Sequence, residues 1–122
     1  MNIKIISNDT ELTATIDDDD FAEKLEEALP VESSARTWGE EVYFTLPIHD
    51  DVNDDATDVV DPGTVTYWAQ GSAMAIPYGP TPASHDDECR LAAAVNILGE
   101  LDGDPDQLGD ISDGDPVRVE RV

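Results

Sequence analysis

Short stretches in which apolar and polar residues alternate recur along the chain, and this rhythm constrains the fold more than any other feature. Residues 3–5 and 12–16 alternate on either side of Ser7-Asn8-Asp9, a pattern typical of two strands joined by a tight turn. Further strands are predicted at 31–38, 40–46, 64–69, 72–78, 92–98 and 115–122. Because strands do not alternate with helices, the pattern favours an antiparallel barrel or sandwich of about eight strands.

Only one segment has clear helical periodicity, and it predicts a main helix over residues 18–29. Asp17–Asp20 precede an apolar stripe of 3.6-residue period, and Pro30 ends it. Carboxylates at this position favour the positive end of a helix dipole, so we interpret the aspartate run as a solvated helix start and not as a metal site. Asp104–Leu108, with a proline near its start, predicts a short helical turn.

The charge balance excludes several classes of partner. The 122 residues include 6 Lys and Arg against 29 Asp and Glu, a net charge of −23. Nucleic acids and anionic membrane surfaces both require basic residues, so we expect neither as a partner. Since the carboxylates are spread over every segment, we interpret them as adaptation to molar salt, as in a halophile; the alternative is an acidic protein that binds a basic partner or cations.

The chain has no feature of a secreted or membrane-inserted protein. No apolar run approaches the 18 residues of a membrane helix, and Met1–Asp9 lacks the apolar core of a secretion signal. We therefore expect a cytoplasmic protein. The single cysteine, Cys89, excludes an internal disulfide.

Two acidic segments invite a metal-site interpretation, and neither has the spacing for one. Residues 49–63 lack the ligand pattern of a calcium loop and are predicted to form a hydrated loop. His85–Cys89 lacks the second Cys/His pair of a zinc site, and its acids oppose formation of a thiolate. We therefore predict no metal and no cofactor.

Several motifs, read in order, resemble the small prokaryotic cyclophilin-like family. They are Thr37–Phe44, Gly63–Trp68, Ala75–Pro82 and Ala94–Gly99. The resemblance covers nearly the whole chain. It implies one domain, residues 1–122, folded as a closed antiparallel barrel with helices covering its ends.

The resemblance leads to two functional hypotheses. Full-size cyclophilins are peptidyl-prolyl isomerases that use an arginine on a strand beside a hydrophobic proline pocket. Arg36 lies near the position of that arginine, whereas Met74 and Ala75 stand where the pocket phenylalanine is expected, and the pocket Trp and His have no secure match. We therefore expect a binding domain for a peptide or small ligand. The alternative is a weak peptidyl-prolyl cis-trans isomerase with Arg36 as its catalytic residue, although Arg36 also suits a salt bridge.

Strand geometry narrows the candidate cleft residues. Neighbours on a strand face opposite sides, so one residue of Tyr43-Phe44 and one of Tyr67-Trp68 should point out of the barrel. The predicted ligand-binding residues are Trp38, Tyr43, Phe44, Tyr67, Met74 and Tyr78. Only one of Glu40 and Glu41 can face a cleft, and we interpret both as solvated surface.

We predict that salt stabilises the fold. Repulsion among the 23 net negative charges acts over a Debye length of about 10 Å at 0.1 M salt, which shrinks to about 3 Å at 1 M. Thermal unfolding in KCl between about 0.1 and 2 M should therefore show a rising midpoint. An unchanged midpoint would contradict the salt-adaptation hypothesis. Sulfate needs a separate series, because it also strengthens apolar burial.

Overall fold

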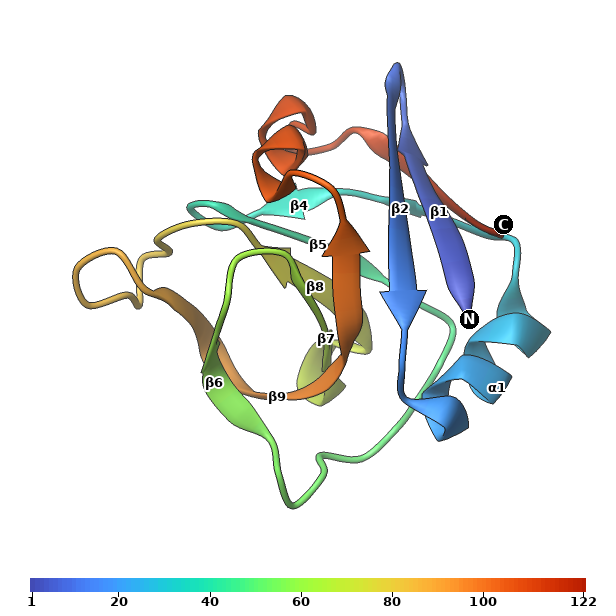
Figure 1. Ribbon diagram of the computed structural model, residues 1–122, viewed down its shortest axis with the longest axis horizontal. Helices are drawn as coiled ribbons and strands as arrows, with labels where there is room; N and C mark the ends of the chain where they lie inside the picture. Colours follow the sequence, from blue (N-terminus) through green and yellow to red (C-terminus); the bar gives the residue numbers. More distant parts are fainter.

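One antiparallel sheet curls into a barrel in the computed structural model, which describes residues 1–122 (Figure 1). The strands are β1 (Asn2–Ser7), β2 (Thr10–Ile16), β3 (Val31–Ser34), β4 (Arg36–Thr37), β5 (Glu41–Thr45), β6 (Thr57–Val60), β7 (Thr64–Trp68), β8 (Ala73–Pro77), β9 (Cys89–Asp102) and β10 (Pro116–Arg121). Their order is β3-β10-β1-β2-β9-β7-β8-β5-β4, and β6 pairs with β9 off this path. The expected antiparallel barrel is confirmed.

The barrel closes at Ala35. The strands at the two ends of the order, β3 and β4, are consecutive in the chain and separated by this one residue. Ala35 is fully buried; its N–H donates to the carbonyl of Asp115 at 2.8 Å, and its carbonyl accepts from the N–H of Gly114. The single strand predicted at 31–38 is thus two strands, because its pairing partner changes from β10 to β5 at this point.

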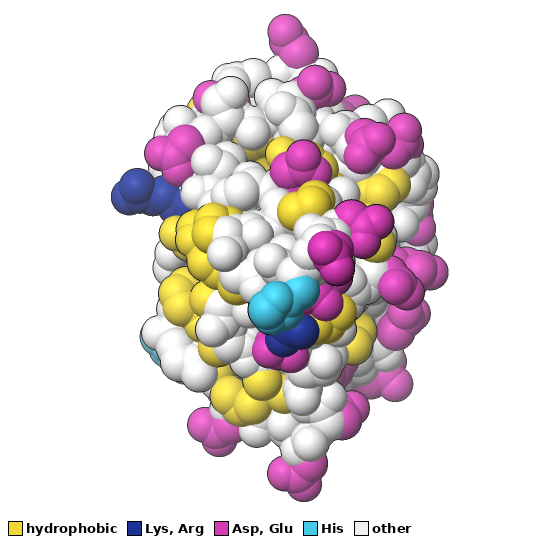
Figure 2. Space-filling view, turned by 90° about the vertical axis from the view of Figure 1, so that its left-hand side faces the viewer, with side chains coloured by type: hydrophobic (Ala, Val, Ile, Leu, Met, Phe, Trp, Pro, Cys, Tyr) yellow, Lys and Arg dark blue, Asp and Glu magenta, His cyan; other side chains and the backbone are white.

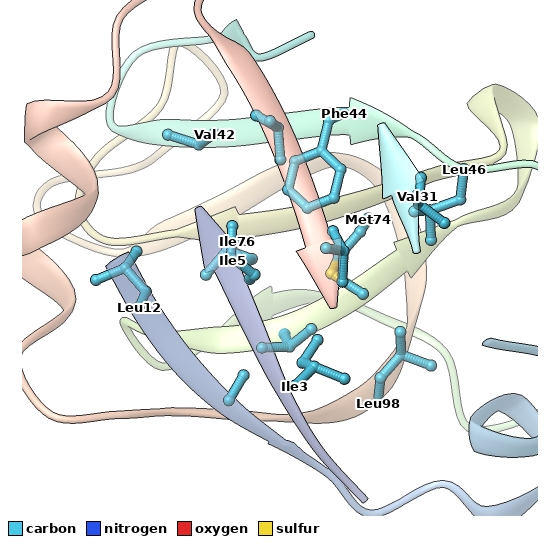
Figure 3. Close-up of a cluster of buried hydrophobic side chains, with 14 of the residues drawn as sticks. Ile3, Ile5, Leu12, Val31, Val42, Phe44, Leu46, Met74, Ile76 and Leu98 are labelled. Atoms are coloured by element: carbon cyan, nitrogen blue, oxygen red, sulfur yellow. The ribbon is translucent and has the colours of Figure 1, made fainter. Parts of the chain in front are cut away.

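Alternate residues of the strands fill the barrel. Ile3 and Ile5 of β1 are buried, as are the inward-facing residues of β2. Figure 3 shows Phe44 and Met74 lying among these aliphatic side chains inside the barrel. In β1 and β2 the hydrophobic effect therefore acts on one face of the strand, which explains the period-2 pattern there, whereas β8 is buried on both faces.

Two helical segments cover the barrel (Figure 1). Helix α1 (Asp19–Ala28) begins where predicted, because the Asp18 carboxylate accepts a 3.0 Å hydrogen bond from the N–H of Phe21. Its buried residues Phe21 and Leu25 join the main core. The predicted short turn is the 3₁₀ helix η2 (Pro105–Asp110), and a second 3₁₀ turn, η1 (Ala69–Gly71), follows β7. No helix is long and apolar enough to cross a membrane.

Strand β9 belongs to two parts of the molecule. Its second half pairs with β2 and β7 in the barrel wall, whereas its first half pairs with β6. The two form an arm, residues 57–60 and 89–95, that we call the β6–β9 arm; it lies at the lower left of Figure 1. Residues 49–63 are therefore not entirely a loop: β6 forms there through pairing with β9 and lacks any alternation of its own.

Candidate functional site

A small pocket lies between the β6–β9 arm and the outer face of the barrel. Leu91 and Val95 of the arm and Ala75 of the barrel wall form an apolar cluster separate from the main core. The pocket has a volume of about 230 Å³. We call it the outer pocket, and its lining consists of Trp38, Glu41, Tyr43, Trp68, Ala75, Leu91, Ala92, Ala93 and Val95. Figure 2 looks onto this side of the molecule, where hydrophobic side chains reach the surface among acidic ones.

Strand alternation supplies two aromatic walls of the pocket. Tyr43 and Trp68 face outward, while their neighbours Phe44 and Tyr67 are buried inside the barrel. The rings of Tyr43 and Trp68 lie edge to face, with centroids 6.0 Å apart and an interplanar angle of 89°. The Trp68 ring packs so closely on Gly71 that a Cβ there would lie 2.4 Å from it. Gly71 therefore helps to hold this wall in place.

Small side chains keep the pocket open. Ala75 on β8 and Ala92 and Ala93 on β9 occupy lining positions where longer side chains would fill the space. The resulting volume is about 230 Å³. A site of this size suits a side chain or a compact ion.

Glu41 is the one carboxyl group in the lining, and surface solvation was the wrong interpretation for it. Glu41 is 6% exposed, and its Oε1 has no hydrogen-bond partner. Burial raises the pKa of this carboxyl to about 7. The neighbouring Glu40 is exposed, as expected. Glu41 and Tyr43 are two residues apart on one strand and therefore lie on the same face. This spacing is the sequence feature that could have placed Glu41 in the pocket.

Two of the predicted ligand-binding residues line the pocket, and Arg36 lies next to it. Trp38 and Tyr43 are lining residues. Arg36 stands directly opposite Tyr43 in the β4–β5 pair, so the two side chains share the outer face. Arg36 is exposed, forms no salt bridge and lies outside the lining.

Four of the predicted ligand-binding residues lie elsewhere. Phe44, Tyr67 and Met74 are buried in the barrel, because closure turns their side of the sheet inward. The Tyr67 hydroxyl donates to the carbonyl of Ile48 at 2.6 Å. Tyr78 packs against the main core, and burial, with Glu40 and Asp106 nearby, raises its pKa. Phe44, Tyr67 and Met74 therefore do not face a cleft on the outer surface, and Tyr78 lies outside the lining of the outer pocket.

Cys89 and His85 do not form a reactive pair in this structure. Cys89 is buried, and burial, followed by the charges of Asp61 and Glu40, raises the pKa of its thiol. His85 is exposed in the preceding loop. The thiol is therefore held in its protonated, weakly nucleophilic form. The structure contains no cluster of three or more His, Cys, Asp or Glu side chains arranged for a metal ion.

Comparison with known proteins agrees with this architecture. A family model described as cyclophilin-like matches residues 1–120. The chain belongs to the cyclophilin-like family. This cyclophilin-like chain is similar to the solution structure of the hypothetical protein AF2241 from Archaeoglobus fulgidus, with 32% sequence identity and a TM-score of 0.83. The match covers 100% of this chain and 95% of that one. No curated protein matches the chain.

We predict that Glu41 destabilises the folded cyclophilin-like domain as pH rises. The pKa of Glu41 is about 7 in the folded state, against an ordinary value of 4.5. The folded state therefore binds the proton more tightly than the unfolded state, and stability falls as the pH rises from 4.5 to 7. The unfolding free energy of Glu41→Gln minus that of wild type should therefore increase by about 2–3 kcal/mol between pH 5 and pH 8. Urea unfolding at constant salt measures the difference.

The matched control is Glu40→Gln, which removes an equal charge from the adjacent exposed residue. Its unfolding free energy should run parallel to that of wild type over the same range. Parallel curves for wild type and Glu41→Gln would show that Glu41 has an ordinary pKa and is not buried.

Proposed function

We propose that this chain is a binding domain that holds a compact group of a peptide or small molecule in the outer pocket. The observation that carries the proposal is the aromatic lining of Trp38, Tyr43 and Trp68 around an open apolar space. Ligand sites are usually concave and apolar, with a few polar groups that set orientation. Glu41, the one acidic residue of the lining, would supply such a group.

The size of the pocket supports a side-chain-sized ligand. Its volume of about 230 Å³ lies below the roughly 300–1,000 Å³ typical of sites for drug-sized molecules. The aromatic rings would contribute contact area with little loss of side-chain freedom, because Tyr43 and Trp68 are already packed against each other.

Weak peptidyl-prolyl isomerisation is the second candidate function. The observation that favours it is Arg36, an exposed guanidinium free of ion pairs beside Tyr43. A cationic donor to a proline nitrogen weakens amide resonance, the source of a barrier of about 18–20 kcal/mol. The inward position of Phe44 and Met74 removes two apolar groups from the face that would hold the twisted amide. Any turnover should therefore be slow.

The net charge of −23 supports a salt-rich cytoplasm as the proposed setting. Such a charge opposes association with nucleic acids and anionic membranes, so the partners that we propose are peptides or small molecules.

Filling the pocket should abolish binding. Ala93→Leu places a larger side chain in the lining, whereas Ala94→Leu changes the next, exposed residue outside it. We expect Ala-Ala-Pro-Phe peptide or 3,3-dimethylbutanol to shift the NMR signals of Tyr43 and Trp68 in wild type and Ala94→Leu. The shifts should be lost in Ala93→Leu. Equal shifts in all three proteins, or none in wild type, would contradict the proposal.

The same peptide distinguishes the isomerase alternative in a protease-coupled assay at high salt. We expect weak or no turnover. Robust turnover that Arg36→Ala removes would favour the isomerase over the binding domain.

A further inference from the structure

We propose that the outer pocket binds a methylated ammonium group, held between the faces of Trp38, Tyr43 and Trp68 with the Glu41 carboxylate as its counter-ion. This inference rests on the proposed binding function and specifies the chemistry of the ligand. The group meant is a quaternary ammonium, which has an apolar methyl surface and no proton to lose, so that burial cannot neutralise its charge.

The aromatic part of the lining suits such a cation. The negative face of an aromatic ring attracts a cation, and indole does so most strongly. The outer pocket has two tryptophans and one tyrosine in its lining, and the Tyr43 and Trp68 rings lie edge to face at 89° to one another. Apart from Glu41, the rest of the lining is alanine, leucine and valine, so the methyl groups of the ligand would contact apolar side chains there.

Glu41 supplies the charge that an apolar ligand would leave unused. Glu41 lines the pocket although only 6% of its surface is exposed, and its Oε1 has no hydrogen-bond partner. Oε1 is closed off from solvent as well as unpartnered, so a ligand in the pocket meets this carboxyl as a charge and not as a hydrogen-bond acceptor. A quaternary ammonium, whose nitrogen carries no proton to donate, would place a positive charge beside the carboxylate and favour its ionised form.

The surroundings of Glu41 leave this charge uncompensated. Tyr43 is the only other titratable residue in the lining. The other charged or titratable groups on the elements around the pocket are Arg36 on β4, Glu40 before β5, Asp58 on β6, Tyr67 on β7, Tyr78 after β8, and Cys89, Arg90, Glu100 and Asp102 on β9. Arg90 is engaged by Asp58 and Glu88 at 2.8 and 2.7 Å. Arg36 is exposed to solvent, which screens its charge.

The test compares choline with 3,3-dimethylbutanol, an uncharged molecule of the same shape, by NMR titration of the wild-type protein at one fixed KCl concentration. We expect choline to bind about tenfold more tightly than the alcohol at pH 8. Because the pKa of Glu41 is about 7, the ionised fraction rises about tenfold between pH 6 and pH 8, and the choline affinity should rise with it. The affinity for the alcohol should not rise.

Two variants assign the effect to Glu41. Glu41→Gln keeps the shape of the side chain and should reduce choline affinity to that of the alcohol, with no dependence on pH. Glu40→Gln removes the same charge from the exposed neighbour and should bind choline as wild type does. Equal loss in both variants would attribute the preference to net charge and overturn the proposal.

The remaining outcomes separate this inference from the function on which it rests. If the alcohol binds as tightly as choline, or both bind more tightly at pH 6, the pocket takes neutral ligands and the cationic inference is wrong while the binding function stands. If neither shifts the pocket signals, both fail. Tighter binding of a trimethyllysine peptide than of choline would identify the ligand as a methylated protein side chain. Tighter binding of choline would identify it as a free small molecule.

Discussion

The pairing of residues 31–37 with β10 on one side and β5 on the other closes the sheet, and the rest of the structure depends on this closure. At Ala35 the chain passes from one edge of the sheet to the other, and its backbone groups bond to the segment before β10. Closure removes free sheet edges and gives the sheet a definite inside and outside. Each adjacent pair of aromatics is then divided between the core and the surface.

The same division produces the candidate site. Tyr43 and Trp68 remain outside the barrel, and the β6–β9 arm folds over them to enclose the outer pocket. Glu41 is carried to this pocket because it lies two residues before Tyr43 on the same strand face. Among the 29 acidic residues of the chain, Glu41 is withdrawn from water in this way, and its burial raises the pKa of its carboxyl.

Local patterns in the sequence predicted much of the fold, but not the sidedness of the barrel. The hairpin of residues 3–16, the helix that begins within Asp17–Asp20 and the outward position of one aromatic in each pair followed from periodicity and capping chemistry. The choice between Tyr67 and Trp68 did not, because closure by distant strands determines which face is inside. For the same reason the sequence does not predict β6, which forms only through its pairing with β9, and it does not distinguish the buried Glu41 from the exposed Glu40.

Barrel closure places an unpartnered carboxyl in an aromatic pocket on the outer face. The most direct test is an NMR titration that follows the ¹³C signal of the Glu41 side-chain carboxyl in wild-type protein. We expect a midpoint near 7. A midpoint near the ordinary value of 4.5 would show that Glu41 is solvated and is not withdrawn into the outer pocket.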